Sequence, residues 1–169
     1  MSRPGMMIGK KEFVVEGPML EVGQAAPDFR LTANNWSVKS LADYTDKLKI
    51  FSIVPSLDTR VCAAQTRRFN QEAGEMGESV VVLTVSTDLP YAQQRWCGAE
   101  GISVVETLSD HKDVNFGLAY GLLVSELRVL QRAVIILDRQ NTVRYVEYVP
   151  VMGSEVNFNA ALESARAFM

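Results

Sequence analysis

The chain contains two cysteines in 169 residues, Cys62 and Cys97. Cys62 follows an apolar run that ends at Val54 and precedes a helical pattern that begins at Ala63. This order places Cys62 where a strand passes into the N-terminus of a helix. Backbone N–H groups lack partners there, and the helix dipole adds roughly half a positive charge, so the thiolate form of a cysteine is stabilised. We therefore expect Cys62 to be a reactive thiol.

Cys62 could instead be a small apolar residue of the core, because free cysteine is usually buried. It shares one face of the predicted helix 59–76 with Phe69 and Ala73, which follow at spacings of seven and four residues. Thr59 is placed to cap this helix with its hydroxyl group. The same hydroxyl would lie within reach of the sulfur, so Thr59 can be both a cap and part of a reactive site.

Cys97 lies in a different setting, at the end of a second predicted helix that runs from Leu89 to Trp96 or Cys97. Asp88 can cap this helix and Gly98 can end it. The helix dipole is negative at this end, which disfavours a thiolate. The two thiols are therefore unequal, and Cys62 is the expected nucleophile.

The composition is that of an ordinary soluble globular protein. A chain of this length, with 47% hydrophobic and 22% charged residues, can bury a full core without disulfides or metal. The formal charge of −3 argues against nucleic acid or an anionic membrane as the main partner. No apolar run reaches the roughly 18 residues of a membrane span, and residues 1–11 lack the apolar stretch of a secretory signal. We expect a cytoplasmic protein that binds neither nucleic acid nor membrane.

Metal and cofactor sites are not expected. The single histidine, His111, stands in the sequence DHKD with neither cysteine nearby, which is too poor a cluster for a four-ligand zinc site. We interpret His111 as a solvated loop residue. Two cysteines in a reducing cytoplasm are more often transient or catalytic than structural.

The hydrophobic pattern predicts one domain over residues 1–169, with residues 1–11 as a loose N-terminal arm and a β-hairpin around Gly17-Pro18. Residues 47–54 and 79–86 are near-continuous apolar runs, as in parallel strands that are buried on both faces. Alternation of strands and helices predicts an α/β fold, a mixed sheet with helices on both faces. The other predicted elements are strands at 26–32 and 103–108, helices at 59–76, 89–97, 115–120 and 157–168, and a hairpin of 132–138 with 142–148.

Pro55, Thr59 and Cys62 have the spacing P-x-x-x-T-x-x-C, which resembles the peroxidatic motif of the peroxiredoxins. The resemblance extends over the chain from about residue 10 and is closest to the thiol peroxidase (atypical two-cysteine) branch. It implies a thioredoxin-like fold, a hydroperoxide substrate with some preference for organic hydroperoxides, thioredoxin as electron donor, and a homodimer. The segments that carry it are 55–70, 95–101, 116–121 and 132–134.

The same resemblance makes Cys62 the peroxidatic cysteine and Cys97 the resolving cysteine, which would form an intramolecular disulfide. Pro55, Thr59 and Arg132 become the rest of the peroxide pocket. Two of these residues have simpler interpretations. Pro55 could do no more than end a strand, and Arg132 could be a surface residue at the start of a strand.

Peroxide reduction requires a thiolate that attacks one peroxide oxygen while charge develops on the other. An unperturbed thiol is only about 3% ionised at pH 7, so complete ionisation gains at most about 30-fold. Hydrogen-bond donors must supply the rest, and we expect the Thr59 hydroxyl, the Cys62 amide and the Arg132 guanidinium to do so. Arg60 stands where the family is expected to hold a small residue or proline, and we interpret its side chain as pointing to solvent.

The two cysteines lie on different predicted helices, and a disulfide needs α-carbons within about 7 Å, so we expect one or both helix ends to unwind when it forms. A redox sensor or relay, whose Cys62–Cys97 disulfide is read by a partner protein, is the alternative function, because a sensor cysteine needs the same reactivity. A thioredoxin-type dithiol oxidoreductase lacks its usual C-x-x-C motif. A purely structural thioredoxin-like module is a third possibility.

Overall fold

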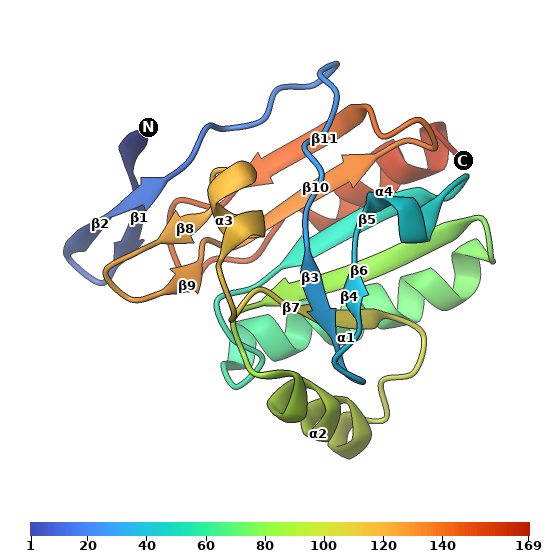
Figure 1. Cartoon of the computed structure of the whole chain (residues 1–169), viewed down its shortest axis with the longest axis horizontal. Coiled ribbons are helices and arrows are strands. Elements are labelled where there is room, and N and C mark those ends of the chain that lie inside the picture. The colour runs from blue at the N-terminus through green and yellow to red at the C-terminus, as the bar shows by residue number, and fades with distance from the viewer.

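The computed structural model describes residues 1–169 and has a seven-stranded mixed sheet at its centre (Figure 1). In sheet order its strands are β11 (Val143–Tyr148), β10 (Ala133–Leu137), β5 (Leu48–Ile53), β6 (Val80–Ser86), β7 (Glu106–Ser109), β3 (Leu31–Ala33) and β4 (Val38–Lys39). Strands β5, β6 and β7 run parallel, and the other neighbours pair antiparallel. The apolar runs of β5 and β6 are buried because they occupy the middle of this sheet.

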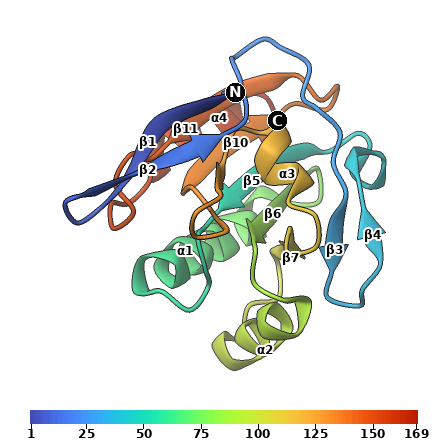
Figure 2. The same cartoon turned by 60° about the vertical axis from the view of Figure 1, so that its left-hand side comes forward.

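Helices cover both faces of the sheet (Figures 1 and 2). On one face Phe69 of α1 and Leu162 of α4 belong to one core cluster, and on the other Phe116 and Tyr44 belong to a second core cluster. The predicted α/β fold, a mixed sheet with helices on both faces, is confirmed. None of the helices combines the length and the apolar composition of a membrane span. The helices are α1 (Arg60–Met76), α2 (Pro90–Glu100), α3 (Asn115–Ala119), α4 (Phe158–Ala167) and the 3₁₀ helix η1 (Leu41–Tyr44).

The N-terminal segment is a β-hairpin, so the prediction of a loose arm over residues 1–11 is wrong. Strands β1 (Ser2–Ile8) and β2 (Lys11–Glu16) pair around a turn at residues 9–10. They join β8 (Leu123–Val124) and β9 (Val129–Leu130) in a second, four-stranded sheet. Pro4 and Gly5 obscure β1 in the sequence because both residue types weaken strands, and the structure accommodates them with a register shift before Met6. The side chain of Met6 is fully buried and anchors the strand.

The expected N-terminal β-hairpin is therefore present, but its turn lies at residues 9–10 and not at Gly17-Pro18, because β2 ends at Glu16 and the next strand, β3, begins only at Leu31. Gly17 has φ +98°, and a Cβ there would lie 2.1 Å from the carbonyl oxygen of Leu118. Only glycine fits such a close approach. The end of β2 therefore packs closely against α3 at Gly17.

Helix α2 extends further than predicted. It passes through Gly98 and ends at Gly101, which adopts the left-handed conformation with φ +67°. The amide of Gly101 donates to the carbonyl of Cys97. Cys97 therefore lies in the last turn of the helix and not at its end, although it remains at the negative end of the helix dipole.

Candidate active site

Cys62 lies in the first turn of α1, and Thr59 is the N-cap residue of that helix. The Thr59 hydroxyl accepts a hydrogen bond from the Cys62 amide at 3.4 Å and donates one to the carbonyl of Ser56 at 3.2 Å. The predicted cap is therefore present, and in this state its hydrogen points to Ser56 and not to the sulfur. The Cys62 side chain is fully buried against Val54 and Leu57.

Arg132 lies immediately before β10 and is only 1% exposed, so its interpretation as a surface residue is wrong. Its Nη2 lies 3.2 Å from the Cys62 sulfur and 3.0 Å from the carbonyl oxygen of Met152. Its Nη1 donates to Oε1 of Gln65 at 2.9 Å. No carboxylate forms an ion pair with it. The Cys62 sulfur is therefore the only ionisable group that is hydrogen-bonded to this buried guanidinium.

Gln65 is a site residue that the sequence analysis missed. It lies three residues after Cys62 on α1, is 1% exposed, and receives the Arg132 hydrogen bond on its oxygen. Its Nε2 donates to the hydroxyl of Ser52 on β5 at 2.9 Å, which sets the orientation of the amide and so of the guanidinium. The spacing from Cys62 could have revealed it, because residues three apart share a helix face.

The N-terminal hairpin also reaches the site. The amide of Met7 donates to the carbonyl of Pro150 at 2.7 Å, and the amide of Met152 donates to the carbonyl of Met7 at 3.0 Å. The carbonyl of Met152 in turn accepts from Arg132. The strand predicted as a loose arm thus holds the loop that positions the guanidinium.

A cavity of about 420 Å³ opens between the hairpin turn, the start of α1 and residues 151–153. Thr59 and Arg132 both line it, whereas Cys62 does not. Arg60 is exposed, as expected, and also lines this cavity. The remaining wall is mostly apolar and includes Met7, Ile8, Val61, Val151 and Met152. Pro55 is buried and lies two residues after the end of β5.

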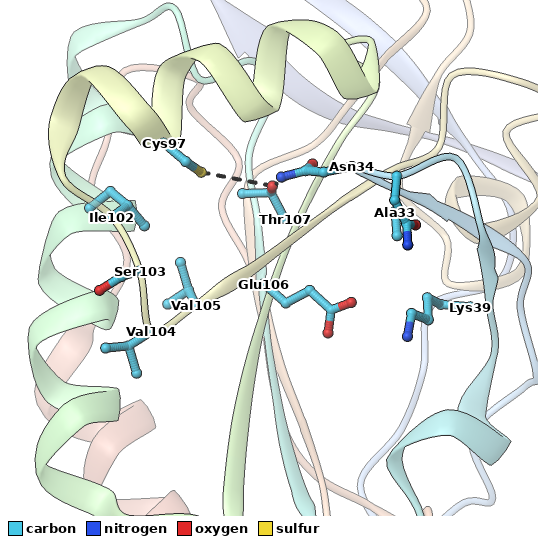
Figure 3. A pocket seen from close by; sticks show the side chains of 11 residues that line it. Ala33, Asn34, Lys39, Cys97, Ile102, Ser103, Val104, Val105, Glu106 and Thr107 are labelled. Atoms are coloured by element: carbon cyan, nitrogen blue, oxygen red, sulfur yellow. Dashed lines mark hydrogen bonds between the residues drawn. The ribbon is translucent and has the colours of Figure 1, made fainter.

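Cys97 does not lie beside Cys62, and both cysteines are free. Its sulfur faces β7, 3.8 Å from the hydroxyl oxygen of Thr107, which donates to Asn34 at 3.0 Å (Figure 3). Burial raises the pKa of the Cys97 thiol, and the hydrogen bond with Thr107 opposes part of this shift. A cavity of about 480 Å³ adjoins Cys97, whereas the preceding Trp96 packs against the cluster that contains Cys62.

Asp88 connects the Cys62 loop to the start of the helix that carries Cys97. Its carboxylate accepts hydrogen bonds from the hydroxyl of Ser56 at 2.8 Å, the amide of Leu57 at 2.8 Å and the hydroxyl of Ser86 at 2.7 Å. The prediction that Asp88 caps α2 is wrong, because no side chain caps that helix. The carboxylate faces the preceding loop instead.

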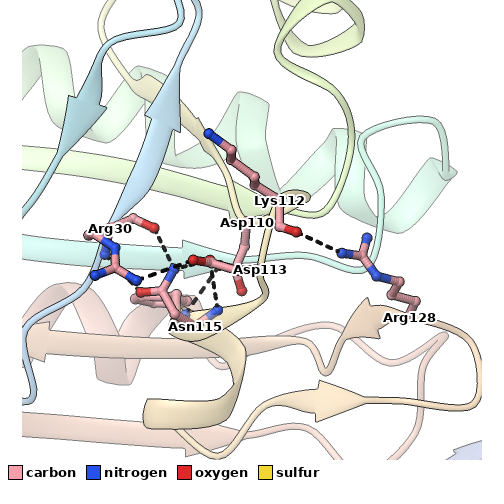
Figure 4. A network of polar contacts seen from close by, with 7 residues as sticks. Arg30, Asp110, Lys112, Asp113, Asn115 and Arg128 are labelled. Atoms are coloured by element: carbon pink, nitrogen blue, oxygen red, sulfur yellow. Dashed lines mark hydrogen bonds and ion pairs between the residues drawn. The ribbon is translucent and has the colours of Figure 1, made fainter.

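His111 lies in a turn after β7, outside the Cys62 site. Its ring is half-buried, with Nδ1 3.0 Å from the Ser109 hydroxyl oxygen and the Trp36 ring packed edge-on against it. The predicted loop position is correct, but the side chain is not fully solvated. The adjacent Asp110 is buried, and Figure 4 shows it within a polar network that includes Arg30, Lys112, Asp113, Asn115 and Arg128.

The thioredoxin-like sheet and the cysteine placed at the start of α1 define a peroxiredoxin-type oxidoreductase. The sequence profile of the Redoxin family matches residues 21–162. The chain belongs to this family.

Curated relatives give the same class. The thiol peroxidase of Streptococcus pneumoniae strain R6 is 54% identical over 151 residues, which cover 89% of this chain and 92% of that protein. The thiol peroxidase of Bacillus subtilis strain 168 is 50% identical over 153 residues, covering 90% of this chain and 91% of that protein. These relationships identify the chain as a peroxidase, within the oxidoreductases.

Solved structures agree with the fold. A peroxiredoxin-like protein from Aquifex aeolicus superposes with a TM-score of 0.91 at 32% identity, covering 99% of both chains. A thiol peroxidase from Chromobacterium violaceum superposes with a TM-score of 0.86 and covers 96% of this chain and 95% of that one. At 19% identity, the second likeness shows the fold alone.

Proposed function

We propose that this chain reduces hydrogen peroxide and organic hydroperoxides through a sulfenic acid at Cys62 and an intramolecular Cys62–Cys97 disulfide. The observation that carries the proposal is the distance of 3.2 Å between Arg132 Nη2 and Cys62 Sγ. A buried guanidinium without a carboxylate partner both stabilises a thiolate and offers hydrogen bonds to an incoming oxygen.

In the first step the Cys62 thiolate attacks one peroxide oxygen. The S–O bond forms as the O–O bond breaks, and the other oxygen leaves as hydroxide or alkoxide and takes a proton from solvent. Arg132 and the Cys62 amide stabilise the developing charge. The Thr59 hydroxyl joins them by rotating away from Ser56, since Thr59 is one of the residues that line the cavity. Pro55 shields the thiol from bulk water.

The cavity supports organic hydroperoxides as substrates. Its wall beyond Thr59 and Arg132 is mostly apolar, so an alkyl group that enters with the peroxide is removed from water. Hydrogen peroxide needs only the polar end of the same cavity. We expect both to react, with the organic substrates gaining the additional apolar contact.

In the second step the Cys97 thiol attacks the Cys62 sulfenic acid, a disulfide forms and water leaves. Because Cys62 is buried in the first turn of α1 and Cys97 faces Thr107, local unwinding must precede this step. Thioredoxin then reduces the disulfide, and the enzyme acts as a homodimer in the cytoplasm, where thiols are kept reduced.

A peroxide-consumption assay coupled to thioredoxin and its reductase tests the proposal on the wild type, Cys62→Ser and Cys97→Ser. We expect the wild type to turn over continuously and Cys62→Ser to be inactive. Cys97→Ser should complete one turnover and stop at a sulfenic acid. A redox sensor would give a single oxidation in the wild type and no continuous consumption. Retained turnover in Cys62→Ser would refute the assigned role of that cysteine.

A further inference from the structure

A row of buried hydroxyl groups crosses the sheet beneath the two cysteine-bearing helices. Ser52 on β5, Thr84 on β6 and Thr107 on β7 are direct neighbours in the parallel ladder. Neighbours in such a ladder direct their side chains to the same face. The Ser52 hydroxyl contacts Gln65 of α1, and the Thr107 hydroxyl contacts Cys97 of α2. Thr84 therefore lies on that face between the two contacts.

Thr84 differs from the other two residues because its hydroxyl has no partner. Its side chain is fully buried, and Oγ1 makes no hydrogen bond. Ser52 and Thr107 are both bonded, to Gln65 and Asn34. A valine would have nearly the same shape without an unpaired polar group, and it would suit the apolar strand β6. An unpaired buried hydroxyl needs an explanation.

A second unpaired atom lies on the helix that carries Cys97. Gln93, one turn before Cys97, is fully buried and donates its amide to the Ser86 hydroxyl and the Leu108 carbonyl. Its Oε1 has no partner, so it does not bond to Thr84 either. Helix α2 and strand β6 thus each carry one buried polar atom without a hydrogen-bond partner. Such atoms would gain a partner if a polar group moved between them in another conformation of the protein.

The group that must enter this region is the Cys97 sulfur. Strand β6 lies between β5 and β7 in the sheet, so a path from Thr107 towards Cys62 crosses β6. On leaving, the sulfur loses its hydrogen bond with Thr107. The Thr84 hydroxyl is the next one in the row.

We propose that Thr84 donates a hydrogen bond to the Cys97 sulfur as it attacks the Cys62 sulfenic acid. The step rests on the proposed function. The Cys97 S–H and the Cys62 S–OH become a disulfide and one water, the Cys97 proton leaving with the sulfenic oxygen. The oxidant is the hydroperoxide already consumed. A donor to sulfur stabilises the thiolate character that the attack requires.

The test compares Thr84→Val with Thr84→Ser, which retains the hydroxyl, and with Thr32→Val, which removes a hydroxyl from β3 outside the row. Each fully reduced protein is mixed with one equivalent of peroxide, quenched at intervals, alkylated and analysed by mass spectrometry. We expect Thr84→Val to form its sulfenic acid at the wild-type rate and to close the disulfide about 10-fold more slowly. Thr84→Ser and Thr32→Val should close it at close to the wild-type rate. The melting temperature of Thr84→Val should equal or exceed that of the wild type.

If Thr84→Val forms the disulfide at the wild-type rate, the inference is overturned, and the Thr84 hydroxyl is then explained by a hydrogen bond to internal water. Slowing of both steps together with a lower melting temperature also overturns it, because the hydroxyl then serves the fold. A wild-type protein that makes a sulfenic acid but no Cys62–Cys97 disulfide removes the proposed function, and the inference falls with it. These outcomes are separate because sulfenic acid, disulfide and stability are measured independently.

Discussion

The carbonyl of Met7 accepts a hydrogen bond from the amide of Met152 at 3.0 Å, and this contact ties the N-terminal hairpin to the candidate active site. The Met152 carbonyl accepts from Arg132, which lies 3.2 Å from the Cys62 sulfur. Three backbone groups of Met7 and Met152, together with the Arg132 guanidinium, thus connect β1 to the Cys62 sulfur. A strand outside the central sheet is therefore part of the structure that positions the site.

Deleting residues 2–8 tests this connection. Without Met7, the loop that holds Arg132 loses two backbone hydrogen bonds, and we expect kcat/KM for peroxide to fall about 10-fold. The seven-stranded sheet should persist because β1 is not part of it. Lys11→Ala, on the same hairpin, is the control, since it removes only the exposed ion pair with Glu126 and the contact of the ammonium with the Phe13 ring. A deletion variant with full activity would show that the hairpin is dispensable for the site.

Arg132→Lys tests the guanidinium. A lysine keeps the charge but cannot bond to Gln65, Met152 and the Cys62 sulfur at once. We expect kcat/KM to fall by about 10- to 100-fold, the equivalent of one charge-assisted hydrogen bond. Urea unfolding should accompany the kinetics, because leaving the Gln65 oxygen unpaired costs about 1–3 kcal/mol. Wild-type kinetics in Arg132→Lys would mean that the point charge alone is sufficient.

Asp88→Asn should loosen the loop before α1. The carboxylate accepts from Ser56, Leu57 and Ser86, whereas an asparagine amide has only one acceptor oxygen. We expect the Leu57 amide to exchange with deuterium about 10-fold faster. Because a looser loop lets the first turn of α1 unwind more easily, we also expect a larger fraction of the sulfenic acid to form the disulfide before a second peroxide oxidises it to sulfinic acid. Asp58→Asn, an exposed change in the same loop, is the control. Unchanged exchange at Leu57 would contradict the prediction.

The buried carboxyl of Asp110 should make stability depend on pH. Burial raises its pKa from 3.8 to about 7, although the amides of Gly117 and Phe116 donate to it. The folded chain therefore binds this proton more tightly than the unfolded chain. The stabilisation is complete below about pH 4 and is lost as the pH rises through about 7.

Urea unfolding of the wild type and Asp110→Asn at pH 5 and pH 8 measures this contribution. The free energy of unfolding of the wild type, relative to the variant, should be smaller at pH 8 than at pH 5. Because all other ionisable groups are shared, their pH dependence cancels in the comparison. A difference that stays constant would mean that Asp110 titrates alike in both states.

Local signals predicted some elements well and others poorly. Helix α1 has local signals at both ends, because Thr59 caps its N-terminus and Gly77, with φ +81°, ends it. Its predicted bounds are therefore nearly correct. The end of α2 was misplaced because Gly98 is tolerated inside a helix, while Gly101 adopts the left-handed conformation that ends it. Strand β1 was missed because its identity depends on pairing with β2 and on burial of Met6, neither of which is local.

The amino-acid sequence by itself determined that Cys62 begins a helix and that Cys97 lies near the end of another, because periodicity and capping act within a few residues. The family resemblance already implied that Arg132 belongs to the pocket, but only the tertiary structure decided how its guanidinium is held against the Cys62 sulfur. Arg132 lies 70 positions later in the chain, and its orientation depends on Gln65 and on a loop held by Met7. These contacts join segments whose separation is set by sheet pairing and packing, and no local pattern encodes that distance.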